Sequence, residues 1–161
     1  MRMFFAATWL LASSAFAADL PTPAEQSAMF KAAGFVQRGS AWHTRDCEGL
    51  EGASYTPGSV EIYKDLNGDG RADAVISEGS GICYGNTGTH FWLLSKQPTG
   101  SWNVMLSNLG IAEPLSIKGA GGWPDISIGG PGFCFPVYRW SGKAYVLNRF
   151  EYQGKRCRRP T

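Results

Sequence analysis

Apolar and polar residues alternate along much of the chain beyond residue 34, and this period of two is typical of half-buried β-strands. In residues 60–64, Val60 and Ile62 share one face of the expected strand, whereas their neighbours face the other way. Turn residues such as Gly and Pro separate the apolar segments, so we expect antiparallel hairpins as the main connections. The predicted strands cover residues 35–36, 41–43, 60–64, 72–77, 90–96, 101–106, 115–118, 125–128, 134–140 and 144–152.

One segment near the N-terminus has the signals of a helix instead. Thr22 suits the N-cap, Pro23 suits the first helical position, and Glu25 completes a capping box. Gly34 is a typical residue to follow the end of a helix. We therefore predict a helix over residues 23–33 that packs on the sheet. The expected fold class is mainly β (α+β), an antiparallel sheet of hairpins with one N-terminal helix.

Two stretches of the chain share a pattern of glycine, acidic, apolar and cysteine residues. Residues 70–83 read GRADAVISEGSGIC, and residues 122–134 read GWPDISIGGPGFC. After a single-residue gap, the alignment places Asp73 opposite Asp125 and Cys83 opposite Cys134, and an aromatic hairpin follows each copy. This self-similarity predicts two degenerate repeats within one domain.

The chain has four cysteines, and their spacing fits no zinc-binding pattern. An even number of cysteines in an exported chain predicts disulfides, for which three connectivities are possible. If the two repeats stack as sheet units, their equivalent cysteines face each other. We therefore expect a Cys83–Cys134 bridge, which leaves Cys47 to pair with Cys157.

Residues 1–17 have the features of a secretory signal peptide. Arg2 precedes an apolar run over residues 3–12, and the small residues Ala15 and Ala17 form an A-x-A cleavage site. Cleavage would leave a single domain over residues 18–161 without a membrane span. Together with the expected disulfides, this signal predicts a periplasmic or secreted protein.

The formal net charge of +2 is small, so the composition gives no reason to expect nucleic-acid binding. The one local excess of positive charge is the C-terminal run KRCRR over residues 155–159. A short basic tail of this kind is usually solvated, and a binding role for it is the less favoured interpretation.

The strongest chemical signal is the loop that follows the strand at residues 60–64. Its oxygen-bearing residues lie at alternate positions, with glycines between them, in the order Asp65, Asn67, Asp69 and Asp73. Oxygen ligands on a glycine-bent loop suit Ca²⁺, and the aspartates would repel one another without a cation. The loop is not an EF-hand, because Ile76 occupies the position of the bidentate Glu and both flanks are predicted strands.

The pattern DxNxDGxxD between two strands resembles the calcium loops of FG-GAP/VCBS-type repeats, as in integrin-like β-propeller blades. The resemblance covers residues 65 to about 77. It implies that Asp65, Asn67 and Asp69 bind Ca²⁺ through their side chains, Arg71 through its backbone carbonyl and Asp73 through its carboxylate. More widely, the chain resembles a group of small, exported bacterial proteins of uncharacterised function, which brings no activity with it. The second copy lacks the loop, so one cation site is expected.

Catalytic groups are few in the sequence. It contains no G-x-S-x-G, HExxH or P-loop motif, and His43 and His90 are its two histidines. The glycine-rich stretch at residues 121–135 carries aromatic residues and suits a peptide or glycan platform, with Trp123, Pro124 and Phe133 as its possible binding loop. The alternative is that these glycines form tight turns and the aromatic rings fill a small core.

These observations predict a secreted or periplasmic, calcium-binding, disulfide-stabilised β domain that acts as a non-catalytic binding module. Its partner would be an extracytoplasmic protein or glycan. Two alternatives are a small envelope hydrolase, with carboxylates near the loop, and an inhibitor of a cell-wall hydrolase. A solvated Glu78 would favour the binding module, a cleft that joins Glu78, His90 and Asp125 would favour the enzyme, and an outward-pointing loop would favour the inhibitor.

Overall fold

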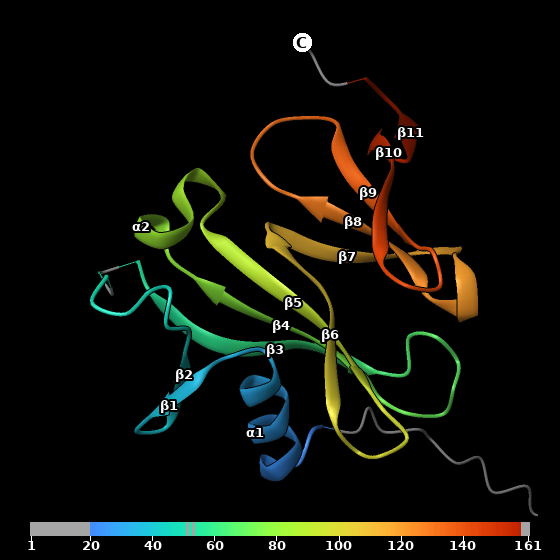
Figure 1. Cartoon of the computed structure of the whole chain (residues 1–161). Helices are drawn as coiled ribbons and strands as arrows, with labels where there is room; N and C mark the ends of the chain where they lie inside the picture. Colours follow the sequence, from blue (N-terminus) through green and yellow to red (C-terminus); the bar gives the residue numbers. More distant parts are fainter. Residues whose placement is uncertain (1–19, 51, 53, 159–161) are drawn as a thin grey trace, which may run out of the picture.

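The computed structural model describes residues 20–50, 52 and 54–158 of the 161-residue chain (Figure 1). The predicted signal peptide at residues 1–17 lies outside the described residues. The helices are α1 (Pro23–Ala32) and α2 (Gly81–Tyr84), with short 3₁₀ turns η1 (Gly85–Thr87) and η2 (Ala120–Gly122). The strands are β1 (Val36–Arg38), β2 (Ala41–His43), β3 (Thr56–Lys64), β4 (Asp73–Gly79), β5 (Thr89–Lys96), β6 (Trp102–Leu109), β7 (Ile111–Lys118), β8 (Pro124–Gly129), β9 (Phe135–Trp140), β10 (Tyr145–Tyr152) and β11 (Lys155–Arg156).

The strands form three antiparallel sheets, and each large sheet is a simple meander. The first large sheet has the order β3-β4-β5-β6, and the second has the order β11-β10-β9-β8-β7. Strands β1 and β2 form a small separate hairpin. The prediction of a mainly β, antiparallel fold is confirmed, although the strands divide among three sheets where we expected one. Asp73 opens β4 and Asp125 is the second residue of β8, so both lie on the second strand of a meander.

Helix α1 covers the outer face of the first sheet (Figure 1). Thr22 and Glu25 form a capping box, in which the Thr22 hydroxyl accepts from the Glu25 N–H at 3.2 Å. Phe30 is fully buried and stacks on Trp42 with ring centroids 5.2 Å apart. A 2.6 Å ion pair between Glu25 and Lys96 links the start of the helix to the end of β5.

The two central strands of the first sheet are buried on both faces. Ala74 and Ile76 of β4 face the α1 side, whereas Val75 between them faces the second sheet. The core on that second side lies between the two large sheets. Its buried members are Leu66, Val75, Phe91, Leu93, Trp123, Ile126, Ile128 and Tyr145. The domain is thus layered as helix, first sheet and second sheet, from bottom to top in Figure 1.

The disulfides are Cys47–Cys83 and Cys134–Cys157. The predicted pairs, Cys83–Cys134 and Cys47–Cys157, are therefore wrong. The two copies of the sequence pattern form successive sheets, so each cysteine meets a partner from its own part of the fold. Cys157 lies beside β10, where its N–H donates to the carbonyl of Phe150 at 3.1 Å.

Candidate metal centre

The loop between β3 and β4 is shaped by its own carboxylates and glycines. Gly68 and Gly70 have φ angles of +85° and +81°, a region that favours glycine. The Asp65 carboxylate accepts from their N–H groups at 2.6 and 2.8 Å. Burial opposes ionisation of Asp65, but the N–H groups of Gly70 and Gly68, with those of neighbouring loop residues, outweigh it and lower the pKa of Asp65. The turn thus forms around an ionised aspartate.

Asp69 is held by the arginine that follows it. Its carboxylate accepts from the Arg71 N–H at 2.9 Å and from the Arg71 guanidinium at 2.5 Å. The guanidinium also donates to the carbonyl of Lys96 at 3.0 Å, which ties the loop to the end of β5. Asn67 accepts from the Asp69 N–H through its side-chain oxygen at 3.0 Å. A cation that used Asp69 would compete with the Arg71 guanidinium, because both need the same carboxylate.

Asp73 is a fully buried carboxylate, and among the described residues no positively charged side chain forms an ion pair with it. One of its oxygens accepts from the Leu66 N–H at 3.1 Å, and the other, Oδ1, has no hydrogen-bond partner in the part of the chain that the structure describes. Burial raises the pKa of Asp73 to about 6, although the Leu66 N–H and the Ser95 side chain oppose the rise, and the negative charges of Asp69 and Asp65 add to it.

Asp125, at the aligned position of the second sheet, is also fully buried, but it is compensated twice. Arg139 forms two parallel bonds with its carboxylate, at 2.8 and 2.9 Å, and Arg149 donates to the same group. Burial opposes ionisation, but the Arg139 and Arg149 guanidinium groups outweigh it and lower the pKa of Asp125. The two aligned aspartates therefore differ in one respect: two arginines balance the second, and no lysine or arginine of the described chain forms an ion pair with the first.

The loop has the residue types that a hard cation prefers as ligands, but the present positions of their side chains fit a cation less well. Over the described residues, no three His, Cys, Asp or Glu side chains are arranged as a metal-binding group. Asp65 is engaged by N–H groups and Asp69 by Arg71. The side-chain oxygen of Asn67 and the backbone carbonyl of Arg71 add neutral oxygen ligands of the kind that Ca²⁺ accepts. The feature that fits a cation is the buried, uncompensated Asp73.

The same loop joins the first sheet to the second. Leu66 is 5% exposed and lies in the core between the sheets. The Lys118 ammonium, at the end of β7, donates to the Leu66 carbonyl at 2.5 Å. The backbone of Gly122 approaches so closely that a Cβ atom there would lie 2.3 Å from the Asn67 carbonyl oxygen. A change in the loop would therefore alter its contacts with both sheets.

The predicted binding loop is wrong for two of its three residues. Trp123 is 6% exposed and packs edge-to-face on Tyr145, and Pro124 is buried beneath the Tyr145 hydroxyl, which donates to its carbonyl at 3.0 Å. These residues fill the core, as the alternative interpretation of the glycine-rich stretch expected. Phe133 alone is exposed, at 75%, with its ring edge-on to Tyr152.

Glu78 is a structural carboxylate. It is fully buried and accepts from the N–H and hydroxyl of Thr44, at 2.9 and 2.5 Å, and from the hydroxyls of Tyr55 and Tyr84. Four donors occupy the lone pairs that a carboxylate offers. Burial and the bond to Glu78 raise the pKa of Tyr84, so its hydroxyl keeps its proton. Sequence reasoning missed these partners, because nothing in the sequence places them next to Glu78.

His90 lies beside Glu78 but is not aligned for acid–base work. Its ring stacks on Trp92 with centroids 4.2 Å apart, and its Nε2 lies 2.7 Å from the Ser107 hydroxyl. Burial lowers the pKa of His90. It lines a cavity of about 580 Å³, but neither Glu78 nor Asp125 lines this cavity. The cleft that would favour a hydrolase is therefore not formed by these three residues, and Glu78 is not solvated either.

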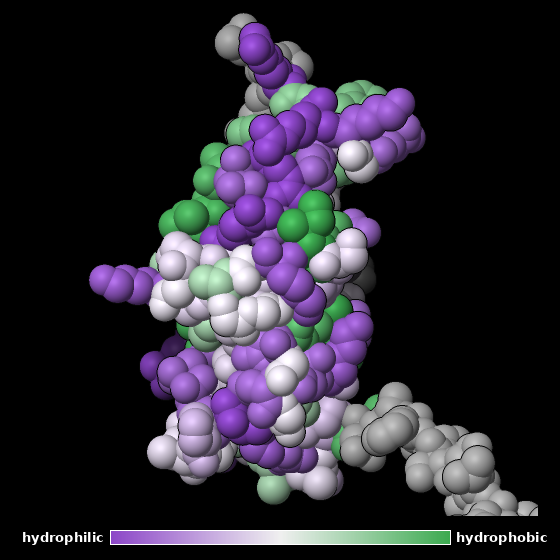
Figure 2. Space-filling view, turned by 90° about the vertical axis from the view of Figure 1, so that its right-hand side faces the viewer, coloured by the Kyte–Doolittle hydropathy of each residue, from purple (hydrophilic) through white to green (hydrophobic). Residues whose placement is uncertain are grey.

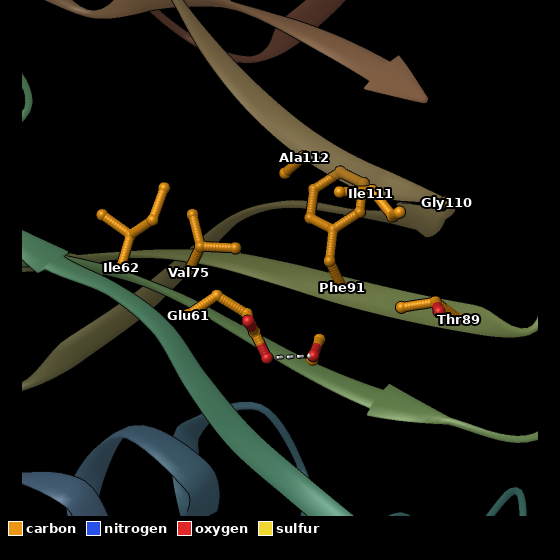
Figure 3. A pocket seen from close by; sticks show the side chains of 9 residues that line it. Glu61, Ile62, Val75, Thr89, Phe91, Gly110, Ile111 and Ala112 are labelled. Carbon is orange, nitrogen blue, oxygen red and sulfur yellow. Dashed lines mark hydrogen bonds between the residues drawn. The ribbon is translucent and has the colours of Figure 1, made fainter. Parts of the chain in front are cut away.

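A second cavity, of about 390 Å³, opens between the first sheet and β7 (Figure 3). Ile62, Val75 and Phe91 point from the first sheet toward Ile111 and Ala112. Glu61 lies at the rim, where it accepts from the Ser77 hydroxyl at 2.7 Å. The residues that line this cavity include no histidine or cysteine, so the space suits apolar contact better than catalysis.

The helices within the described ranges are too short or too polar to cross a membrane. Two disulfides indicate an oxidising, extracytoplasmic environment. No family model, curated protein or solved structure matches the chain significantly, so the site must be argued from its own residues.

Proposed function

We propose that the chain is a secreted or periplasmic calcium-binding β protein, in which the loop from Asp65 to Asp73 holds one Ca²⁺ ion. The ligands would be the side chains of Asp65, Asn67, Asp69 and Asp73 and the backbone carbonyl of Arg71. The resemblance of DxNxDGxxD to the loops of FG-GAP/VCBS-type repeats supports this ligand set. In this proposal Ca²⁺ stabilises the protein and has no catalytic role.

One observation carries the proposal: the contrast between the aligned aspartates Asp73 and Asp125. Both are fully buried, and a buried carboxylate needs a positive partner or a full set of hydrogen-bond donors to stay ionised. Asp125 has Arg139 and Arg149 as partners. Asp73 has a free oxygen within the described structure and two further aspartates nearby. A bound cation would give Asp73 the positive charge that Asp125 obtains from arginines.

The position of the loop supports a stabilising role for the cation. Leu66 of the loop is packed between the two sheets. From the side of the second sheet, Lys118 contacts the Leu66 carbonyl and Gly122 approaches the Asn67 carbonyl. A cation that fixes the loop would therefore also fix the contact between the sheets. We propose that this contact keeps the surface of a non-catalytic binding module in one shape for an extracytoplasmic protein or glycan.

Calorimetric titration with Ca²⁺ and Mg²⁺, together with thermal unfolding in Ca²⁺ and in EDTA, tests the metal site. We expect Ca²⁺ to bind more tightly than Mg²⁺ and to raise the melting temperature. Asp69→Ala should abolish both effects, whereas Asp46→Ala, which changes an exposed aspartate outside the loop, should leave them intact. A wild-type protein that gives no heat of binding and melts equally in Ca²⁺ and EDTA would contradict the proposal.

A second candidate, inhibition of a cell-wall hydrolase, rests on Phe133. This ring is 75% exposed in the connection between β8 and β9, which extends from the second sheet in Figure 1. An exposed aromatic on a disulfide-fixed loop suits insertion into a partner's cleft. The test is the rate of peptidoglycan hydrolysis by envelope hydrolases with and without the protein. Inhibition that Phe133→Ala does not weaken would exclude this loop as the contact.

A further inference from the structure

Arg156, Cys157 and Arg158 of the C-terminal basic run line a cavity. The cavity has a volume of about 500 Å³ and lies beside β10, at the end of the molecule opposite α1 (Figure 1). Figure 2 shows strongly hydrophilic residues gathered at this upper end, next to a few hydrophobic ones. The described residues that line the cavity are Asn148, Arg149, Phe150, Arg156, Cys157 and Arg158.

The lining carries three arginines and no carboxylate among the described residues. Arg149 is neutralised by Asp125 and Glu151, to which it donates through Nη1 and Nε. The charges of Arg156 and Arg158, whose side chains are exposed, come in addition to this neutralised group. The cavity therefore has a net positive charge, which favours an anionic ligand.

Arg149 contributes a rigid donor that is not used within the protein. Its side chain is only 5% exposed and is fixed by Asp125, by Glu151 at 2.5 Å and by the Asn148 side chain at 3.0 Å. Its remaining nitrogen, Nη2, is buried and has no hydrogen-bond partner within the described structure. Buried N–H groups are rarely left unpaired, so this nitrogen points to a missing acceptor.

The other two arginines are held in place beside it. The Cys134–Cys157 bridge anchors the residue between them to the start of β9. Arg156 pairs with Glu151 in the β10–β11 ladder, and the Cys157 N–H donates to the Phe150 carbonyl at 3.1 Å. The backbone that carries Arg156 and Arg158 is thus fixed, so binding an anion would have to order only their exposed side chains.

We propose that this cavity binds a phosphoryl group. Arginine forks match phosphate oxygens with two parallel hydrogen bonds, and a phosphoryl group offers enough oxygens to meet Arg149, Arg156 and Arg158 together. A carboxylate has only two oxygens for the same donors. The group could belong to a soluble phosphate or phosphate ester or to a lipid head group, which share this chemistry. The site uses residues separate from the calcium loop, and it stands if that loop binds no metal.

The test is titration of the full mature chain with inorganic phosphate in EDTA, which also removes any calcium effect, followed by calorimetry. We expect saturable binding that the double variant Arg156→Ala/Arg158→Ala weakens by about tenfold or more. The matched control is Lys143→Ala/Lys155→Ala, which removes the same charge from exposed positions of the same sheet outside the cavity. Thermal unfolding without ligand verifies that each variant remains folded with its disulfides.

Vesicles separate the two sources of the group. Binding to phosphatidylglycerol vesicles but not to phosphatidylcholine vesicles, lost in the arginine double variant, identifies a lipid head group. Binding of free phosphate without vesicle binding identifies a soluble ligand. The proposal is overturned if neither probe binds, if the lysine control loses as much affinity as the arginine variant, or if sodium chloride at equal ionic strength abolishes phosphate binding.

Discussion

The same substitution, Asp to Asn, should have opposite consequences at the two aligned aspartates. Asp73→Asn removes a buried charge that has no positive partner in the described structure. Asp125→Asn removes a buried charge on which Arg139 and Arg149 depend. Since both changes keep the size of the side chain, the comparison isolates charge from packing.

The expected change in stability for Asp73→Asn follows from the pKa of Asp73, which burial raises from an ordinary 3.8 to about 6. The folded protein holds the Asp73 proton more tightly than the unfolded chain, so stability falls as pH rises from about 4 to about 6. Above that range the ionised carboxylate costs about 3 kcal/mol. In EDTA at neutral pH, Asp73→Asn should recover this loss, less about 1–3 kcal/mol for burying an incompletely paired amide. The expected change is thus between none and a gain of about 2 kcal/mol.

Asp125→Asn should change the free energy of unfolding in the opposite direction. The pKa of Asp125 is lowered, because its two arginines outweigh the effect of burial. Asp125→Asn leaves Arg149, whose side chain is 5% exposed, with Glu151 but without its buried counter-charge Asp125. Breaking a buried ion pair by removing one partner typically costs about 3–5 kcal/mol. Asp125→Asn should therefore destabilise the protein by roughly this amount, with or without Ca²⁺.

Measuring the stability of each variant with and without Ca²⁺ gives a second comparison. A ligand at about a hundred times its dissociation constant stabilises the folded state by about 2.7 kcal/mol. The wild type and Asp125→Asn should gain this stability, whereas Asp73→Asn should gain none. Urea unfolding followed by tryptophan fluorescence, at about pH 5 and about pH 7.5, gives all the values. The reasoning is refuted if Asp73→Asn in EDTA is destabilised as much as Asp125→Asn, or if the stability of the wild type in EDTA does not fall relative to that of Asp73→Asn between these two pH values.

Three further substitutions test the contacts around the loop and the core. Arg71→Ala removes the guanidinium that occupies Asp69 at 2.5 Å, so calorimetry should show a severalfold higher Ca²⁺ affinity; a weaker affinity would mean that the ion pair helps to shape the site. Glu78→Gln should lower the free energy of unfolding in urea by about 2–4 kcal/mol, because the amide offers the buried donors one acceptor oxygen in place of two; an unchanged value would contradict the structural role. Gly122→Ala should lower the free energy of unfolding by about 2 kcal/mol or more, because its Cβ would lie 2.3 Å from a loop carbonyl oxygen. The control Gly142→Ala is also at positive φ, but its Cβ would lie 3.9 Å from the nearest atom, so it should cost about 1 kcal/mol. Equal losses in the two variants would rule out the clash.

The sequence predicted those parts of the fold that depend on neighbouring residues. Alternation and turn chemistry indicated the β5–β6 and β9–β10 hairpins, because both signals lie within a few residues of the strands they define. Strand β7, Ile111–Lys118, was predicted only over residues 115–118, since Gly110 and Pro114 interrupt its pattern. Long-range pairing was beyond the sequence, so the division into sheets and the disulfide partners were not predicted correctly.

The candidate site divides in the same way. The calcium loop was predicted because its Asp, Asn and Gly residues are contiguous, and its ligands remain a prediction. The partners of the buried carboxylates were missed, because they come from distant strands. Arg139 and Arg149 follow Asp125 by 14 and 24 residues, and Thr44 precedes Glu78 by 34. A pair of arginines in two later strands carries no local signal of the aspartate that they neutralise.

The contrast between the two aspartates suggests why the loop is present in only one copy of the pattern. A buried aspartate at the second strand of each sheet needs a positive charge or a full set of hydrogen-bond donors, because the low-dielectric interior penalises an isolated carboxylate. In the second sheet the arginines at positions 139 and 149 provide that charge at all times, so no loop ligands are needed. In the first sheet, positions on the neighbouring strand β5 that face Asp73 include Ser95, which is neutral. If the proposed Ca²⁺ binds the loop, it would balance the ionised Asp73, and the stability of the first sheet, unlike that of the second, would then depend on the Ca²⁺ concentration.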